Sequence, residues 1–292
     1  NRIVTIQDIS GLGKCSLTVA LPLISAMGIE CAVLPTAVLS THTAFQGFNF
    51  RDLTSDIQKI ADHWKSKQIH FDAIYTGYLG SIEQIDLVSK FIDDFSDRGA
   101  LTIVDPCMAD NGVLYKGFTK EFAARMGELC TKANIITPNL TEACFLLNIP
   151  YIPEGYDEGY IKNIAVRLSE LGAKKIILKD IVFSDTSEKN ETNKEKIGNL
   201  CYDSETENFT WYFHKKMQEN FHGTGDIFAS VLTGGIMRGL PVEKAMKLSA
   251  DFVAESIKAT LSHADYNWYG VDFETCIPYL LSRLEEGAGT RF

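Results

Sequence analysis

Short apolar segments alternate with longer amphipathic segments along most of the chain. Strand-like runs such as "RIVTI", "CAVLPTAVL" and "ALTIVDP" end in polar or glycine-containing turns, and the segments between them carry apolar residues at helical spacing. Strands separated by helices of about 10 to 15 residues build βαβ units, so the pattern predicts an α/β fold with a mainly parallel central sheet flanked by helices. The predicted helices span residues 16–27, 54–67, 82–97, 120–131, 160–171, 226–238 and 242–260.

The alternation stops after residue 179. Residues 184–196, "SDTSEKNETNKEK", are polar and charged without aliphatic periodicity, which predicts an exposed, mobile loop. The next two segments, "IGNLCYD" and "NFTWYFH", are typical of two strands of a hairpin. No repeat and no shift in composition divides the chain, so a single domain over residues 1–292 is predicted.

Composition and charge narrow the classes of partner. The chain has 292 residues, 45% of them hydrophobic and 23% charged, as is ordinary for a globular protein. Its net charge of -10 argues against nucleic acid or an anionic membrane as the main partner. Phosphate-bearing ligands stay possible, because glycine loops and helix N-termini bind anions locally.

The seven cysteines and the apolar runs bear on the compartment. The cysteines are scattered and never form a C-x-x-C pair, which favours reduced thiols over disulfides or a zinc site. No apolar run approaches the roughly 20 residues that span a bilayer, and no secretory signal pattern precedes "RIVTI". We therefore expect a cytoplasmic protein.

The segment "TIQDISGLGKCSLTVAL", residues 5–21, resembles a nucleotide-binding loop at first sight. A P-loop requires glycine, four residues and then Gly-Lys-Ser/Thr, so that backbone amides surround the phosphates. Here Asp8 stands at the place of the first glycine, and Cys15 follows Lys14 where a hydroxyl is needed. The spacing excludes a P-loop, and Lys14 is predicted to be a solvated or structural lysine.

The strongest chemical signal is "FHGTGDIFASVLTGGI", residues 221–236, where a glycine turn leads into an amphipathic helix. Gly223 and Gly225 allow backbone conformations in which several amides point the same way, and the helix N-terminus adds unpaired N–H groups. Together they favour an anion hole, with Asp226 placed to take a proton from an attacking hydroxyl. The alternative is that Thr224 or Asp226 only caps the helix.

"GTGD" at the start of a late helix resembles the ribokinase-like family of small-molecule kinases. Other segments follow in the family's order: "LSTHTAFQGF", "YTGYLGS", "VDPCMADNG" and "ITPNLTEA". They resemble, in turn, an S-N-H-T loop, S-G-Y-L-G-S, D-P-V-M-G-D and T-P-N-x-x-E. The resemblance extends from about residue 3 to about residue 260 and is strongest to the pyridoxal/pyridoxamine kinases. It implies a three-layer ribokinase-like fold.

The resemblance also implies an activity, the ATP-dependent phosphorylation of the 5′-hydroxymethyl group of pyridoxal, pyridoxamine or pyridoxine. In that family the aspartate is the base and the glycine turn holds the transferred phosphoryl group. The loop from Ser40 to Phe50 is expected to cover the substrate, while His42 and His222 are expected to be structural. The implied catalytic residues are Gly223, Thr224, Gly225 and Asp226, and the implied substrate-binding residues are Asp8, Ser10, Thr43 and Tyr78.

Carboxylates near ATP phosphates repel them unless a cation lies between, so Mg²⁺ is expected, held directly or through water. The "TPNLTEA" segment also has a purely structural interpretation, a helix start with Asn139 and Glu142 as a capping box, and both interpretations can hold together. The sequence departs from the family at Cys107 and Ala109. The predicted ATP-binding residues are Asp105, Asn139, Glu142, Lys179 and Thr224, and the predicted metal ligands are Asp105, Asp110 and Glu142.

Further expectations rest on the resemblance alone. Family members are usually homodimers and often use K⁺ besides Mg²⁺, and the loop at 184–196 is expected to flank the adenine. Two rival functions stay open. "FHGTG" also resembles the H-G-T-G-C of hydroxymethylpyrimidine kinases, although aspartate in place of that cysteine favours the B6 kinases. A non-catalytic ligand-binding relative is the rival from another class.

Overall fold

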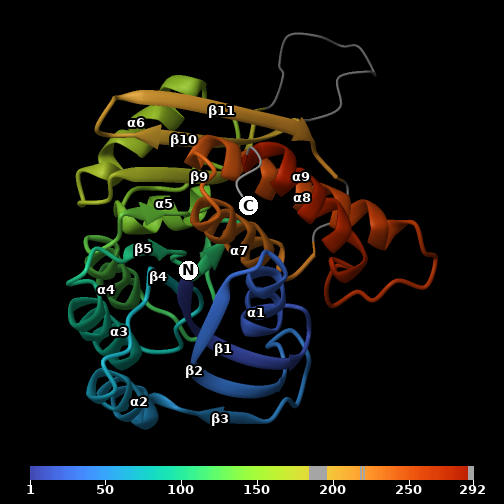
Figure 1. Ribbon diagram of the computed structural model, residues 1–292. Coiled ribbons are helices and arrows are strands. Elements are labelled where there is room, and N and C mark those ends of the chain that lie inside the picture. Colours follow the sequence, from blue (N-terminus) through green and yellow to red (C-terminus); the bar gives the residue numbers. More distant parts are fainter. Residues whose placement is uncertain (184–195, 218, 220, 289–292) are drawn as a thin grey trace, which may run out of the picture. The chain divides into compact units, whose positions relative to one another are not determined.

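The computed structural model describes residues 1–183, 196–217, 219 and 221–288 (Figure 1). It has the predicted α/β fold, with mostly parallel sheet strands flanked by helices. The chain forms two compact units, the first being Asn1–Thr102 with Glu219–Phe292 and the second Ile103–Gln218. The single-domain organisation stays a prediction. Most of the predicted polar loop, residues 184–195, lies outside the described residues.

In the first unit, β1 (Arg2–Leu12) lies between β2 (Glu30–Thr41) and β4 (Ala73–Thr76) and is parallel to both. A short strand that the sequence did not predict, β3 (Phe50–Asp52), pairs antiparallel with β2. Residues 3–8 of β1 are all buried, as expected for a parallel strand covered on both faces. The polar residues Asp8 and Ser10, towards the carboxyl end of β1, are buried as well.

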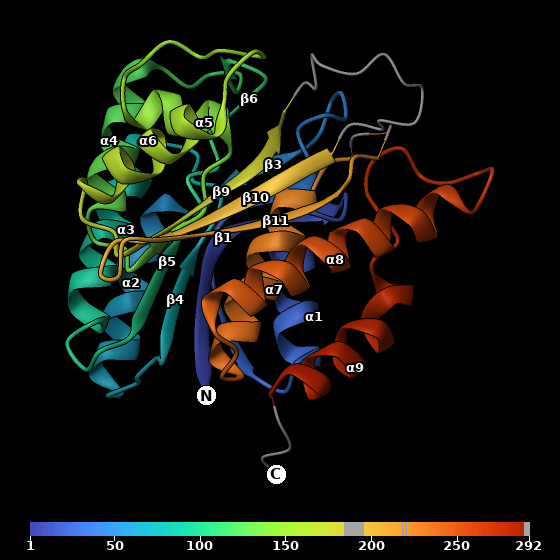
Figure 2. The ribbon, with the colours of Figure 1, turned by 90° about the horizontal axis from the view of Figure 1, so that it is seen from above.

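Helices cover both faces of these strands. Figure 2 shows α1, α7 and α8 on one side of β1, with α2 and α3 on the other. Helix α7 is buried from Asp226 to Gly235, which explains why it is apolar on nearly all sides. The sequence did not predict the last helix or the 3₁₀ turn Glu274–Cys276 before it. The helices are α1 (Leu17–Ala26), α2 (Thr54–Ser66), α3 (Ile82–Phe95), α7 (Thr224–Met237), α8 (Val242–Leu261) and α9 (Ile277–Ala288).

The second unit begins at Ile103, within β5 (Leu101–Val104). Its strand order is β5-β8-β9-β10-β11. β5 and β9 are both parallel to β8, whereas β9, β10 and β11 pair antiparallel, which confirms the predicted hairpin. These strands are β8 (Ile135–Ile136), β9 (Lys175–Val182), β10 (Lys196–Asp203) and β11 (Asn208–Lys215).

Three helices and a small hairpin complete the second unit. α4 (Lys120–Cys130), α5 (Leu140–Leu146) and α6 (Glu158–Ser169) lie together (Figure 2), and α5 and α6 pack against β9. β6 (Ala109–Asp110) and β7 (Val113–Leu114) form a separate two-stranded ribbon that the sequence did not predict. Among the described residues of both units, no helix is long and apolar enough to cross a membrane.

Candidate functional site

Ser16 joins two buried carboxylates in the first unit. Its hydroxyl donates to Asp8 Oδ1 at 2.6 Å, and its backbone N–H donates to Asp226 Oδ2 at 2.9 Å. Asp8 Oδ2 accepts a second hydrogen bond, from the Ser10 hydroxyl at 2.8 Å. The end of β1 and the start of α7 therefore meet through one residue, although Asp8 and Asp226 are far apart in the sequence.

Ser16 has no predicted role, and the only sequence signal for it is its place before a helix. It is the N-cap of α1 but makes no side-chain cap, because its hydroxyl is bonded to Asp8. Both Lys14 (φ 51°) and Ser16 (φ 52°) lie in the left-handed region, which is costly for residues other than glycine. A backbone of this kind persists only where surrounding contacts hold it, and it points the Ser16 N–H at Asp226.

Burial raises the pKa of two groups near Ser16, the Asp8 carboxyl and the Cys15 thiol. Burial raises the pKa of Asp8, although the hydroxyls of Ser16 and Ser10 favour its charged form. Burial raises the pKa of the Cys15 thiol, and the negative charges of Asp226 and Asp8 raise it further. Cys15 therefore stays protonated at neutral pH and is no nucleophile.

The start of α7 settles the question of the helix cap. Its N-cap is Gly223, in the left-handed region at φ 81°, and no side chain caps the helix. The Thr224 hydroxyl donates to the Phe221 carbonyl, while Asp226 accepts the Ser16 N–H. Neither Thr224 nor Asp226 is the N-cap residue of α7, which is Gly223. Asp226 stands in the first turn of α7, where helix N–H groups have no partner within the helix itself.

The remaining predicted substrate-binding residues lie in the same unit. Thr43 is exposed in the turn after β2, and Tyr78 is partly buried two residues after β4. His42 is buried, and its ring packs 4.9 Å from that of His222. The predicted covering loop is shorter than expected, because β2 continues to Thr41 and β3 begins at Phe50.

Acid is expected to destabilise the protein through His42. Its Nδ1 accepts the Ala44 N–H at 3.2 Å, so the ring proton lies on Nε2, 3.0 Å from the Tyr269 carbonyl. Burial lowers the pKa of this imidazole below 6.5, so the folded ring stays neutral where the unfolded ring binds a proton. The effect of His42 therefore leaves the free energy of unfolding at its full value above about pH 6.5 and lowers it as the pH drops below that value.

Urea unfolding across this pH range tests the effect of His42. In His42→Asn the amide oxygen can take over the bond from Ala44, and the titrating ring is gone. The stability of this variant should vary less with pH between about 7.5 and 5.5 than that of the wild type. An equal pH dependence in both proteins would show that His42 is not the group responsible.

The second unit contains a buried ion pair. Lys179 Nζ lies 2.8 Å from Asp105 Oδ1, and the two side chains are only 5% and 2% exposed. The Thr137 hydroxyl donates to the same oxygen at 3.0 Å. Burial alone would lower the pKa of Lys179, but the negative charges of Asp105 and Glu142 outweigh it and raise the pKa. The ammonium group is therefore charged and pairs with Asp105.

Glu142 and Asn139 form the capping box of α5, which confirms the structural interpretation of "TPNLTEA". The Glu142 carboxylate accepts the N–H of Asn139 at 2.8 Å and that of Met108 at 3.2 Å. The Asn139 amide group donates to the Ala109 carbonyl at 2.9 Å. Burial raises the pKa of Glu142, and the nearby Lys179 opposes this shift. Ala109 takes part in this arrangement through its backbone, within β6.

The predicted metal ligands are not gathered into one cluster. Asp105 is paired with Lys179, Glu142 with backbone N–H groups, and Asp110 is exposed and bonded to Asn111. In the part of the chain that the structure describes, no group of three or more His, Cys, Asp or Glu side chains is arranged to hold a metal ion. Their oxygen donors nevertheless suit Mg²⁺, which in nucleotide sites takes one or two carboxylates and completes its shell with phosphates and water.

Known proteins resemble this chain over most of its length. Residues 21–269 match the family described as phosphomethylpyrimidine kinase. A proposed phosphomethylpyrimidine kinase from Bacteroides thetaiotaomicron, in an orthorhombic crystal form with pyridoxal, is 38% identical, with a TM-score of 0.88 over 96% of this chain and 95% of that one. Pyridoxal kinase from Lactobacillus plantarum is 28% identical, with a TM-score of 0.84 over 98% of each chain.

One curated relative is named for pyrimidine substrates. The hydroxymethylpyrimidine/phosphomethylpyrimidine kinase of Haemophilus influenzae is 29% identical over 190 residues, which are 64% of this chain. The chain spans 65% of the length of that relative. Similar proteins are thus named as kinases of two different ring systems.

Proposed function

We propose, because the chain belongs to the phosphomethylpyrimidine kinase family, that it uses ATP to phosphorylate the 5′-hydroxymethyl group of a vitamin B6 vitamer. The substrate would be pyridoxal, pyridoxamine or pyridoxine. The observation that carries the chemistry is the place of Asp226, buried in the first turn of α7 and bonded to the Ser16 N–H. The family is one of kinases, and Asp226 is the group in the first unit best suited to act as their base.

The reaction moves one phosphoryl group and one proton. The hydroxymethyl oxygen forms a bond to the γ-phosphorus, the bond from that phosphorus to the bridging oxygen breaks, and ADP leaves. The hydroxyl proton passes to the Asp226 carboxylate. The N–H groups of the Gly223–Gly225 turn stabilise the negative charge on the transferred group, because the helix N-terminus points partial positive charge at it.

Residues of the second unit, together with Thr224, are proposed to bind the nucleotide. Lys179 and Asn139 would face the phosphates. Asp105, Asp110 and Glu142 would hold Mg²⁺, directly or through water, and the ion would neutralise charge on the phosphates. Lys179 meanwhile forms a buried ion pair with Asp105 within the protein.

The choice of B6 over the pyrimidine rests on two supports. The Bacteroides relative, 38% identical over nearly the whole chain, has a crystal form with pyridoxal, and Asp226 replaces the cysteine of the H-G-T-G-C motif. The second candidate is hydroxymethylpyrimidine kinase, which the family description and the Haemophilus relative favour. Both substrates offer a primary alcohol on a nitrogen heteroaromatic ring, so the same base serves either one.

ADP release tests the proposal. The purified protein is mixed with Mg-ATP and, separately, with pyridoxal, pyridoxamine, pyridoxine or hydroxymethylpyrimidine. We expect turnover with at least one B6 vitamer and a kcat/KM for it above that for the pyrimidine. Turnover with the pyrimidine alone would move the function to the second candidate. Binding of a vitamer without ADP release would indicate a ligand-binding relative instead.

A further inference from the structure

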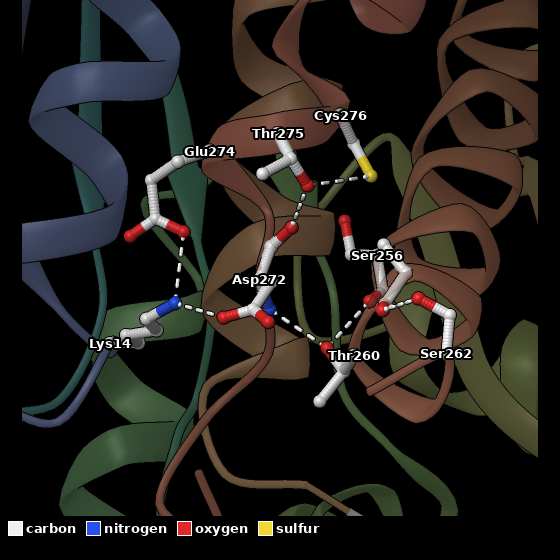
Figure 3. Close-up of polar contacts among 9 residues, drawn as sticks. Lys14, Ser256, Thr260, Ser262, Asp272, Glu274, Thr275 and Cys276 are labelled. Atoms are coloured by element: carbon white, nitrogen blue, oxygen red, sulfur yellow. Dashed lines mark hydrogen bonds and ion pairs between the residues drawn. The ribbon is translucent and has the colours of Figure 1, made fainter. Parts of the chain in front are cut away.

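Lys14, which has no role in the proposed chemistry, is the centre of a charged cluster in the first unit. Its ammonium group lies 2.7 Å from Asp272 Oδ1 and 3.0 Å from Glu274 Oε2, as Figure 3 shows. The side chain of Lys14 is 19% exposed and that of Asp272 27%, against 52% for Glu274, so Asp272 is the better shielded partner. The ammonium group also lies 5.9 Å from the centre of the Phe273 ring.

Asp272 is itself held in place. Its N–H donates to the Thr260 hydroxyl at 2.8 Å, and that hydroxyl donates to the Ser256 carbonyl at 2.7 Å, one turn earlier in α8 (Figure 3). The Asp272 carbonyl accepts the Thr275 hydroxyl at 3.0 Å. Because Thr260 is fully buried, this chain of hydrogen bonds anchors the backbone of Asp272 to α8.

The backbone of Lys14 is enclosed by two glycines. A Cβ on Gly223 would lie 2.0 Å from the Lys14 carbonyl oxygen, and a Cβ on Gly270 would lie 2.6 Å from Lys14 Cβ. The loop is therefore packed against the N-cap of α7 on one side and the segment before Asp272 on the other. Two residues further along this loop, Ser16 donates its N–H to Asp226.

We propose that Lys14 is a positioning residue for the catalytic base. Its ion pairs with Asp272 and Glu274 hold the loop of residues 13–16 against Gly223, which keeps the Ser16 N–H on Asp226 Oδ2. The inference rests on the proposed function only in naming Asp226 as the base. Lys14 does not touch the reacting groups, so its effect reaches the reaction through the backbone.

Strain in the loop explains why such a clamp is needed. Lys14 and Ser16 both adopt left-handed backbone conformations, which are unfavourable for residues other than glycine. Without the ion pairs, the loop is free to relax towards more favourable conformations and to carry the Ser16 N–H away from Asp226. A shift of about 1 Å in a catalytic group can cost about a hundredfold in rate.

Lys14→Met tests the clamp, because methionine keeps an unbranched chain against Gly270 and removes the charge. We expect kcat to fall by about tenfold to a hundredfold with little change in KM, and Lys14→Arg to restore most of the loss. The matched control is Lys65→Met, which breaks the 2.5 Å ion pair with Asp94 in the same unit. Asp272→Asn should reproduce the kinetic effect from the other side of the pair.

The amide NMR signal of Ser16 gives a readout independent of turnover. In the folded Lys14→Met protein we expect this signal to shift by more than in Lys65→Met. An active wild type with Lys14→Met matching the control in kcat and in the Ser16 signal would overturn the clamp alone. A wild type inactive on all four alcohols would overturn the proposed function, and the Ser16 signal would still decide whether Lys14 holds the loop. If Lys14→Met does not fold, Asp272→Asn and Glu274→Gln take its place.

Discussion

Replacing Asp226 by asparagine is expected to lower kcat for the preferred alcohol by about 10²- to 10⁴-fold, the usual contribution of a general base. Asparagine keeps the size of the side chain, and its amide oxygen can still accept the Ser16 N–H. The fold, and the KM for the alcohol, should therefore change little. Steady-state ADP release, measured beside thermal unfolding of the same preparation, separates the loss of the base from a loss of structure.

Asp56 provides a matched control for Asp226→Asn. Asp56 and Asp226 both occupy the third position of a helix in the first unit, after Leu53 and Gly223 as N-caps. Asp56→Asn therefore removes the same favourable interaction between a carboxylate and the helix dipole, without touching the glycine turn. Equal activity losses in the two variants would show that Asp226 acts through helix stability and not as a base.

The sequence predicted the long elements because their burial is periodic. α3 is an example: its buried positions recur at helical spacing, and Ser81 caps it through the Gln84 N–H. The missed elements have weaker local signals. All three residues of β3 are exposed, so it shows no alternation of buried and exposed positions. It forms a strand because its backbone pairs with β2. In the segment of α9, Leu280 and Leu284 are buried four residues apart, which is helical spacing.

The site was predictable where its residues are neighbours in the chain. Asn139 and Glu142 are three residues apart, which is the spacing of a capping box, and they form one. Ser16 was missed because its role depends on two left-handed residues and on a partner, Asp226, far along the chain. Lys14 was predicted to be solvated or structural, and its partners Asp272 and Glu274 lie more than two hundred residues away in the sequence. Such contacts follow from packing, which no local pattern records.

Position along a strand gives only part of what Lys179 does. It lies in the carboxyl-terminal half of β9, where ligand groups of open α/β sheets are common, and this favoured a nucleotide contact. In the structure, Lys179 also forms a buried ion pair with Asp105. The parallel register of β8 and β9 continues as a bridge between Asn139 and Lys179, which places the ammonium group beside Asp105. A lysine that neutralises a buried carboxylate also contributes to folding.

Lys179→Met is therefore expected to lower the free energy of unfolding by about 3–5 kcal/mol, because it leaves Asp105 buried and uncompensated. The matched control is Lys175→Met, in the same strand, whose ion pair with Asp203 is more exposed and should be worth at most about 1 kcal/mol. Urea unfolding measures both. Adding Asp105→Asn to Lys179→Met should recover part of the loss, since the charge that has no partner is then gone. If Lys179→Met costs no more than Lys175→Met, the buried pair is not what stabilises this unit, and Lys179 is left with the nucleotide contact alone.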